Sequence, residues 1–344
     1  MRRATAVLVL AAMLAIAGPA AGAAASHDRG WFRKVHLPPA MATYEWHNAG
    51  DLSSAEAGRR LRFLRAHGFR TIYLEIGAYL DADELDPGPG RERRLDTVRR
   101  QIRRFVATAS SLGLAVHGLG GGPTWTTEER RYLGQKLVTL VGDYNAGARA
   151  NERLQGVHLD LEPYTQPGWL DDDRVHDNLV EYLITIEGIV DTYRSVLTRH
   201  HCRHLQLGFA VPFWFDARGD APGEVLYHED TKPAVHHVID LIADLPGAYL
   251  VVMSYRNFTR TSNGSIAHAR DEFRYAAEVD ARSGLVVGQQ YGPPGPGEEH
   301  TTFNGRPRWV FKRAAAEIAL AFRRYPQFRG LSVDDVDSYM AASP

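Results

Sequence analysis

The chain has 344 residues, of which 44 % are hydrophobic and 24 % are charged, a composition typical of a soluble globular protein. Forty Lys and Arg residues against 41 Asp and Glu residues leave a formal net charge of −1, a balance that does not favour binding to nucleic acid or to an anionic membrane. A single cysteine, Cys202, excludes an intrachain disulfide framework and a thiolate metal cluster.

The first 25 residues have the pattern of a secretory signal peptide. Two arginines follow Met1, an apolar run occupies 4–17, and the alanines at 23–25 match an A-x-A cleavage site. The apolar run is shorter than the roughly 20 residues that span a bilayer. We therefore predict that residues 1–25 are removed, and that the mature chain is secreted or periplasmic without membrane association.

Eight short apolar segments rich in branched residues follow, each with the composition of a buried strand. Their starts lie roughly 30 to 50 residues apart, which leaves room for a helix between successive strands. The predicted strands are 42–46, 71–76, 114–119, 156–161, 205–211, 249–254, 285–288 and 330–333.

Amphipathic helical patterns lie between these segments. Ser53 and Glu56 form a capping box in front of the first helix. In the second helix, apolar residues recur at helical spacing over 98–112. Further helices are predicted from Thr126 onward and over 173–199, 232–243, 266–283 and 309–324.

This alternation predicts an α/β fold, a (β/α)₈ TIM-type barrel rather than a doubly wound sheet. The strands are nearly continuous runs of Val, Leu and Ile, as expected where both faces of a parallel sheet are covered. The chain ends soon after the eighth strand, so the eighth helix is expected to be truncated or missing. We predict that residues 26–344 form a single barrel domain, with loops at 86–90, 216–232 and 292–297.

The fourth predicted strand carries an alternating set of polar residues. His158, Asp160 and Glu162 alternate with apolar residues, so their side chains share one face of the strand. Because the apolar face must pack against helices, the polar face is expected to line the barrel interior, near the strand ends that form the active site in such barrels. Burial of two carboxylates for packing alone is costly, so catalysis is favoured over a polar layer that only fills the barrel.

Two carboxylates at positions i and i+2 of a strand have Cα atoms roughly 6.5 Å apart. At that separation one carboxyl group retains its proton more readily than an isolated one. General acid catalysis requires a carboxylic acid that is neutral near the working pH. We therefore predict Glu162, nearest the mouth, as the general acid and Asp160 as its partner.

Here the chain resembles the family 18 glycoside hydrolases, which are chitinase-like (β/α)₈ enzymes. Their motif on the fourth strand, D-G-x-D-x-D-x-E, aligns with residues 155–162. The chain keeps Gly156 and the last two carboxylates of the motif, whereas glutamine and His158 stand at its first two acidic positions.

A second family motif, Met-x-Tyr-Asp on the sixth strand, aligns with residues 253–256, where the chain has Arg256 in place of Asp. The family tryptophan of the eighth strand is absent, and Asp334 and Asp335 occupy that region.

The resemblance implies a glycosidase without a cofactor that acts on a polysaccharide or oligosaccharide, with amino-sugar polymers favoured. Glu162 would protonate the glycosidic oxygen, and Asp160 would steady a substrate N-acetyl group that attacks the anomeric carbon. The Tyr255 hydroxyl would lie near the reacting sugar.

A second chemistry pairs Glu162 with a carboxylate across the barrel, and the candidates are Glu75 and Asp334 or Asp335. Many retaining barrel glycosidases have a glutamate nucleophile at the end of the seventh strand, where this chain has two glutamines. We predict that the first of them, Gln289, lines the site with His158, Arg256 and these carboxylates.

Aromatic residues follow several of the predicted strands and suit stacking against sugar rings. The alternative is that large rings close the top of the barrel beneath long loops. The predicted rim consists of Trp46, Trp125, Trp169, Phe213, Trp214 and Phe215.

Two further classes of protein stay open. A barrel that has lost catalysis would bind carbohydrate without cleaving it. A metal-dependent hydrolase would use His117, His158 and Asp160 as ligands, but no H-x-H or H-E-x-x-H pairing supports it, and no metal is predicted. The glycines at 120–122 after the third strand are either a flexible loop or a site of close backbone approach.

Overall fold

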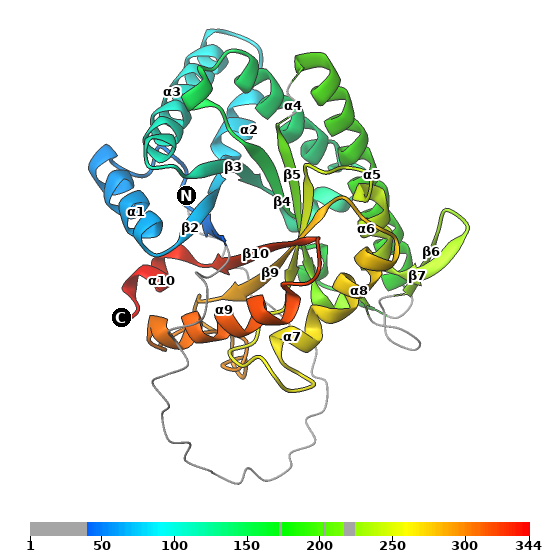
Figure 1. The fold of residues 1–344 in the computed structure, drawn as a ribbon. Coiled ribbons are helices and arrows are strands. Elements are labelled where there is room, and N and C mark those ends of the chain that lie inside the picture. Colours follow the sequence, from blue (N-terminus) through cyan, green and yellow to red (C-terminus); the bar gives the residue numbers. More distant parts are fainter. Residues whose placement is uncertain (1–39, 172–173, 202–203, 217–223) are drawn as a thin grey trace.

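The structure is a computed structural model that describes residues 40–171, 174–201, 204–216 and 224–344, so the predicted signal peptide lies outside the described residues. In this part of the chain, eight parallel strands close into a barrel in the order β1-β10-β9-β8-β5-β4-β3-β2 (Figure 1). The barrel strands are β1 (Met41–Glu45), β2 (Phe69–Glu75), β3 (Ala115–Gly120), β4 (Gly156–Asp160), β5 (Gln206–Pro212), β8 (Ala248–Met253), β9 (Gly284–Gln290) and β10 (Phe328–Asp334). The prediction of a (β/α)₈ barrel is confirmed.

Helices surround the barrel and cover the outer face of the strands (Figure 1). They are α1 (Ser54–Ala66), α2 (Gly77–Asp83), α3 (Pro89–Ser111), α4 (Tyr132–Ala146), α5 (Val175–His200), α6 (Ala234–Ile242), α7 (Ser265–His268), α8 (Arg270–Glu278), α9 (Arg308–Phe322) and α10 (Val336–Ala341). The predicted cap of α1 is present, because Ser53 Oγ accepts a hydrogen bond from the Glu56 backbone N–H at 3.2 Å. The helix that follows β10 is α10, which has six residues.

Three predicted segments differ from the structure. Thr126 ends the 3₁₀ helix η2 (Pro123–Thr126), and α4 begins only at Tyr132. The helix predicted over 266–283 is divided into α7 and α8.

The loop predicted over 216–232 contains an antiparallel hairpin of β6 (Glu224–Tyr227) and β7 (Asp230–Pro233). His228 and Glu229 form its turn with φ of 47° and 65°. A two-residue turn with positive φ is ordinarily signalled by Asn or Gly, which are absent from this pair.

Side chains of each barrel strand alternate between the interior and the helices. On β4, Val157, Leu159 and Leu161 belong to the large core between strands and helices, so the intervening polar residues face the interior. The apolar part of the interior is a separate cluster formed by Ala42, Tyr44, Tyr73, Leu119, Ala210, Tyr249, Val251, Met253 and Val286. The prediction that the polar side chains of the fourth strand face the barrel interior is therefore confirmed.

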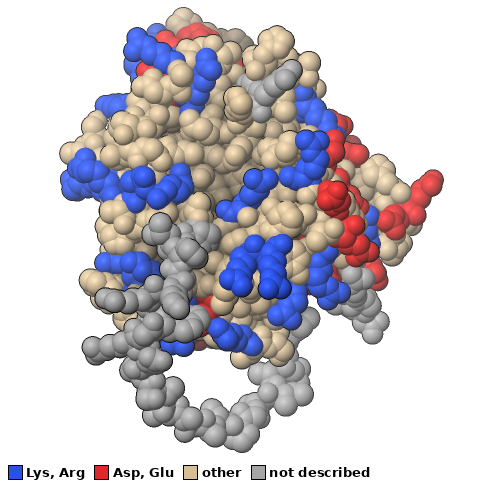
Figure 2. Space-filling view, in the orientation of Figure 1, with Lys and Arg blue, Asp and Glu red and all other residues tan. Residues whose placement is uncertain are grey.

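The outer surface is mixed in charge. On the face drawn in Figure 2, blue Lys and Arg side chains form separate groups, and red acidic side chains gather toward the side where the β6–β7 hairpin projects. Within the described residues, no helix combines the length and apolarity needed to cross a bilayer.

Candidate active site

Four carboxylates meet inside the barrel at the carboxyl ends of the strands. Glu75 ends β2, Asp160 ends β4, Glu162 follows Leu161, and Asp334 ends β10. Burial raises the pKa of Asp160 well above its usual value, and the negative charges of the other three raise it further. We call these four residues the mouth carboxylates. Active sites of (β/α)₈ barrels lie at this end of the barrel.

Glu162 stands where the chain leaves the strand, directly before the 3₁₀ helix η4 (Pro163–Thr165). The Tyr164 hydroxyl donates a hydrogen bond to Glu162 Oε1 at 2.7 Å. Burial raises the pKa of Glu162, and this hydrogen bond lowers it because it favours the charged form. Tyr164 was not assigned a role from the sequence, although its position two residues after the predicted acid was the available signal.

Asp160 lies between the loop after β3 and the other mouth carboxylates. Its Oδ1 atom is buried and has no hydrogen-bond partner. Gly121, in the predicted glycine segment, has φ of 154°, and a Cβ built there would lie 2.0 Å from the Asp160 carbonyl oxygen. The glycine therefore permits the close backbone approach that was one of its two predicted roles.

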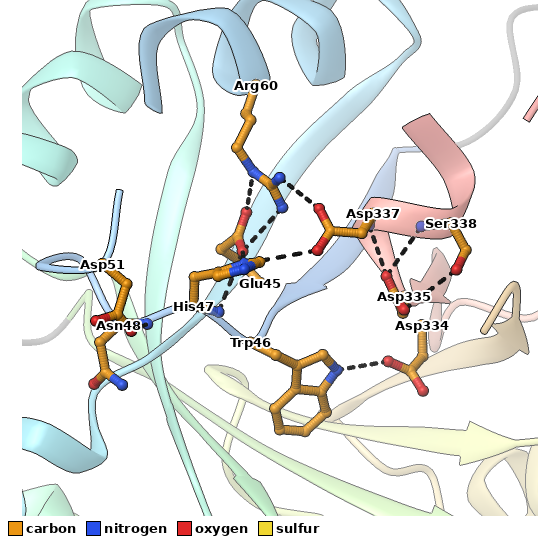
Figure 3. Close-up of polar contacts among 10 residues, drawn as sticks. All are labelled: Glu45, Trp46, His47, Asn48, Asp51, Arg60, Asp334, Asp335, Asp337 and Ser338. Carbon is orange, nitrogen blue, oxygen red and sulfur yellow. Dashed lines mark hydrogen bonds and ion pairs between the residues drawn. The ribbon is translucent and has the colours of Figure 1, made fainter. Parts of the chain in front are cut away.

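Asp334 is held by an indole rather than by a cation. The Trp46 Nε1–H donates a hydrogen bond to Asp334 Oδ1 at 2.8 Å, as Figure 3 shows. Burial raises the pKa of Asp334 to about 7, and the charges of Asp335 and Glu162 also raise it, whereas the Trp46 hydrogen bond lowers it. Asp335 itself caps α10, because its side chain accepts from the backbone N–H groups of Asp337 and Ser338.

Glu75 completes the group from the neighbouring side of the barrel. Its Oε1 accepts a hydrogen bond from the Gly77 backbone N–H at 2.5 Å. Burial raises the pKa of Glu75 to about 7, and the charge of Asp81 adds to the rise. Carboxyl groups with such pKa values exchange protons near neutral pH, as acid–base catalysis requires.

Tyr255 faces the mouth carboxylates from the end of β8. Burial raises the pKa of its hydroxyl well above its usual value, and the charges of Asp334, Asp160 and Glu162 raise it further. The hydroxyl therefore stays protonated and can donate a hydrogen bond to an oxygen of a bound molecule.

His158 lies below the mouth in a layer of aromatic side chains. It is fully buried, its Nε2 lies 3.0 Å from the Tyr44 hydroxyl, and its Nδ1 lies 3.1 Å from the Tyr249 hydroxyl. Its ring stacks on Tyr73 with centroids 4.0 Å apart. These neighbours enclose the ring, which lies deeper in the barrel than the sequence predicted for a residue that contacts substrate, and burial keeps its pKa well below the usual value.

The metal hypothesis placed His117 and His158 near each other, and they do approach the same group. His117 Nδ1 lies 2.9 Å from the Tyr249 hydroxyl that also contacts His158. Burial lowers the pKa of His117 to about 3. In the described part of the chain, no group of three or more His, Cys, Asp or Glu residues is arranged to hold a metal ion.

Gln289 packs outside the barrel, so its predicted place in the site is corrected. It is fully buried, its Nε2 donates to the Ser254 carbonyl oxygen at 3.2 Å, and its Oε1 accepts from Ser265 Oγ at 3.1 Å. Because Val286 of the same strand faces the interior, the alternation places Gln290 on the interior side instead.

Arg256 is also directed away from the mouth carboxylates, which corrects its prediction as a substrate contact. Its guanidinium donates to Asn263 Oδ1 at 3.1 Å and to the Tyr255 carbonyl oxygen at 2.7 Å. The same group lies over the Phe213 ring, 5.1 Å from its centroid. These contacts hold Arg256 in the outer shell of the barrel, where it is buried.

The predicted aromatic rim divides into one exposed ring and several packed ones. Trp46 is 45 % exposed and stacks on Tyr44 with centroids 5.6 Å apart. Trp125 and Trp214 are partly buried and pack against the outer core. Trp169 is only 5 % exposed and belongs to that core. Among the described rings of the predicted rim, Trp46 is therefore the exposed one.

A different set of charged residues lies on the outer side of β1 (Figure 3). Arg60 donates to Glu45 Oε2 at 2.7 Å and to Glu45 Oε1 at 3.1 Å, and it also donates to Asp337. His47 Nδ1 lies 2.8 Å from Glu45 Oε1. We call Glu45, His47, Arg60 and Asp337 the outer ion-pair network.

A cavity of about 210 Å³ opens at the opposite end of the barrel, lined among others by Thr71, His117, Tyr249 and Arg329. Tyr249 and His117 in its lining belong to the layer of aromatic side chains that contains His158. The amino-terminal end of such barrels serves stability rather than catalysis, so the candidate active site is the mouth with its carboxylates.

Comparisons with known proteins show similarity of fold. No family model matches the chain, and no curated protein sequence matches it. The structure of a GH5_18 variant from Streptomyces cattleya in complex with Manb1-4GlcNAc is 17 % identical, with a TM-score of 0.53 over 87 % of this chain and 71 % of that chain.

Two further structures match at lower TM-scores. The GH18 chitinase from Cycas revoluta in complex with (GlcNAc)3 is 14 % identical, with a TM-score of 0.46 over 87 % of this chain and 95 % of that one. A D-allulose 3-epimerase from Methylomonas sp. is 13 % identical, with a TM-score of 0.45 over 86 % and 84 %. The comparison with the GH5_18 structure shows that the chain shares its barrel fold at low sequence identity. A shared fold does not by itself define a reaction.

Proposed function

We propose that the protein is an exported glycoside hydrolase that uses Glu162 as its general acid. The observation that carries this proposal is the Asp160–Glu162 pair inside the barrel mouth, where burial raises both pKa values and the charge of Glu162 raises that of Asp160 further. A carboxyl group that holds its proton near neutral pH can protonate a poor leaving group. Removal of residues 1–25 and a location outside the cytoplasm are part of the same proposal.

In the proposed reaction, Glu162 gives its proton to the glycosidic oxygen while the bond between that oxygen and the anomeric carbon breaks. The ionised mouth carboxylates stabilise the positive charge that develops on the sugar ring. A new bond then forms from the anomeric carbon to a water oxygen, and the water proton passes to a carboxylate across the mouth, for which Asp334 and Glu75 are the candidates. The Tyr255 hydroxyl is a hydrogen-bond donor to the reacting sugar.

A substrate N-acetyl group offers a second route, in which its carbonyl oxygen attacks the anomeric carbon and Asp160 steadies the group. The free Oδ1 of Asp160 suits that role. In either route the exposed ring of Trp46 supports one face of a sugar.

The test is release of reducing ends from a panel of polysaccharides by the wild-type chain and by Glu162→Gln. We expect the variant to lose about 10²-fold or more of the turnover while its melting temperature stays close to that of the wild type. Glu278→Gln is the matched control, because Glu278 is exposed at the end of α8, away from the mouth. Equal activity in Glu162→Gln would overturn the assignment.

A carbohydrate-binding barrel without catalysis is the second candidate, favoured by the departures from the family motifs at Gln155 and Arg256. It predicts that oligosaccharides bind while no reducing ends appear with any substrate of the panel.

A further inference from the structure

None of the four mouth carboxylates has a cationic partner among the described residues. In the described residues, no nitrogen of Lys, Arg or His lies within 4.0 Å of any of the four. Elsewhere, Glu45 pairs with Arg60, and Glu317 pairs with Arg260 and Arg313.

The hydrogen bonds of the mouth carboxylates come from neutral donors. Asp334 accepts from an indole, Glu162 from a phenol and Glu75 from a backbone amide. Asp160 Oδ1 accepts from no group although it is buried. Several carboxyl groups held together without counter-charge are unfavourable unless they are protonated or a positive ligand joins them.

We propose that the mouth binds a glycan whose sugars carry free, protonated amino groups, a de-N-acetylated amino-sugar polymer. This inference rests on the proposed function and names its substrate class. An ammonium group brings three hydrogen-bond donors and a positive charge to oxygens that lack both. An N-acetyl group instead presents a single amide N–H donor, a carbonyl oxygen, which is an acceptor, and a methyl group, and it brings no positive charge to the carboxylates.

The surroundings of the carboxylates fit such a sugar. Trp46 lies beside Asp334 with 45 % of its surface exposed, and a ring of this kind accepts both the apolar face of a sugar and a nearby cation. An ammonium group imposes no fixed coordination geometry, in contrast to a metal ion, for which the described residues offer no set of three ligands.

The proposal also selects between the two routes of hydrolysis. A free amino group has no carbonyl oxygen to attack the anomeric carbon, so the route assisted by the substrate is closed. The water must then be activated by a mouth carboxylate, and Asp334 and Glu75 remain the candidates for the base. Glu162 still supplies the proton to the leaving oxygen.

The experiment is titration calorimetry of Glu162→Gln, which binds without cleaving, with hexamers of β-1,4-linked glucosamine and of N-acetylglucosamine at about pH 6, where an amino group is protonated. We expect the glucosamine hexamer to bind at least tenfold more tightly. Because an added cation lowers the pKa of the carboxyl groups, its binding should release protons, visible as a dependence of the heat on the ionisation enthalpy of the buffer.

Two further variants in the same background identify the source of the preference. Asp334→Asn and Glu75→Gln should each reduce the preference about tenfold or more while the affinity for the N-acetylated hexamer changes less than twofold. Asp191→Asn is the control for loss of one surface charge, because Asp191 is 68 % exposed on α5. Its preference should equal that of the parent.

The outcomes separate this inference from the proposed function. Tighter binding of the N-acetylated hexamer, or a preference that neither variant changes, overturns the inference. If the wild-type chain then cleaves an N-acetylated or neutral glycan through Glu162, the proposed function stands without it. If the glucosamine hexamer binds with proton release but the wild-type chain does not cleave it, the inference stands and the catalytic proposal fails.

Discussion

Glu45 and Asp334 lie at the ends of neighbouring barrel strands, yet the protein treats them in opposite ways (Figure 3). Glu45 points outward from β1 into the outer ion-pair network, where Arg60 contacts both of its oxygens. Asp334 points inward from β10, where an indole is its donor and where burial raises its pKa to about 7. The alternation of side chains along a strand thus separates a carboxylate that supports the fold from one that is available for chemistry.

The comparison predicts different costs when each carboxylate is perturbed. The negative charge of Glu45 is compensated by Arg60 in the folded state. Without Arg60 the charge would be buried and uncompensated, which lowers the free energy of unfolding. The negative charge of Asp334 has no such partner, so its removal should raise the free energy of unfolding. Removal of the partner of Glu45 should therefore lower the stability of the fold, whereas removal of the charge of Asp334 should raise the stability and lower the activity.

The largest effect on stability is expected from Arg60→Ala. This change leaves Glu45, which is 1 % exposed, without its bidentate partner, and it should lower the free energy of unfolding by about 3–5 kcal/mol. Urea unfolding of the variant measures the loss. Arg313→Ala is the control, because its ion pair with Glu317 is exposed on the arginine side and should change stability by less than about 1 kcal/mol. Similar losses of unfolding free energy in both variants would show that the buried ion pair of Glu45 stabilises the fold no more than the exposed one.

The opposite sign is expected from Asp334→Asn. Asparagine can still accept the Trp46 hydrogen bond but carries no charge, so at about pH 8 the variant should be more stable on the order of 1–2 kcal/mol. Its hydrolytic activity should fall at least tenfold if Asp334 activates water. Urea unfolding and a reducing-end assay measure the two quantities, and a loss of stability at pH 8 would show that the negative charge supports the fold.

The same carboxyl groups predict how wild-type stability depends on pH. The pKa values of Glu75 and Asp334 are about 7 in the folded chain and about 4 in an unfolded one. Between these values the unfolded chain has released protons that the folded chain retains, so stability falls as pH rises from about 4 to about 7. The contribution of these groups is fully present below about pH 4 and is lost above about pH 7.

Urea unfolding across this pH range tests the prediction by comparison of the wild type with Asp334→Asn. The difference in stability between the two chains should grow as pH rises through the window and become constant above it. A difference that is constant from about pH 4 to about pH 8 would contradict a raised pKa for Asp334 in the folded state.

The fold could be predicted from the sequence because its strands are short, nearly continuous apolar runs, whereas its helices repeat apolar residues at helical spacing. The face of β4 that lines the interior could also be predicted, since polar and apolar residues alternate there and only one face can contact the helices. On β9 the residues on both faces are apolar or small, so no alternation indicates which glutamine at its end faces the interior. The sequence interpretation chose Gln289, and the structure places that side chain among Ser254 and Ser265 instead.

The neighbours of His158 could not be predicted from the sequence, for a different reason. The alternation of side chains along β4 correctly predicted an interior position for His158. Its partners Tyr44 and Tyr249, however, come from strands distant in the sequence. Depth within the barrel is set by the register between strands, which single-strand patterns do not contain. The interpretation therefore placed His158 in contact with substrate, whereas it lies in the layer below.

The smallest predicted effect concerns the hydrogen bond from Tyr164 to Glu162, in the Tyr164→Phe variant. Loss of this bond removes an interaction that lowers the pKa of Glu162, so that pKa should rise by up to about one unit. Because a general acid must be protonated, the alkaline limb of the pH–rate profile should move to higher pH by the same amount, while the rate on the acid side falls less than about tenfold. Tyr132→Phe is the matched control, since the Tyr132 hydroxyl donates to Glu84 on the surface and its loss should leave the profile unchanged. An alkaline limb that does not move in Tyr164→Phe would mean that a group other than Glu162 supplies the proton.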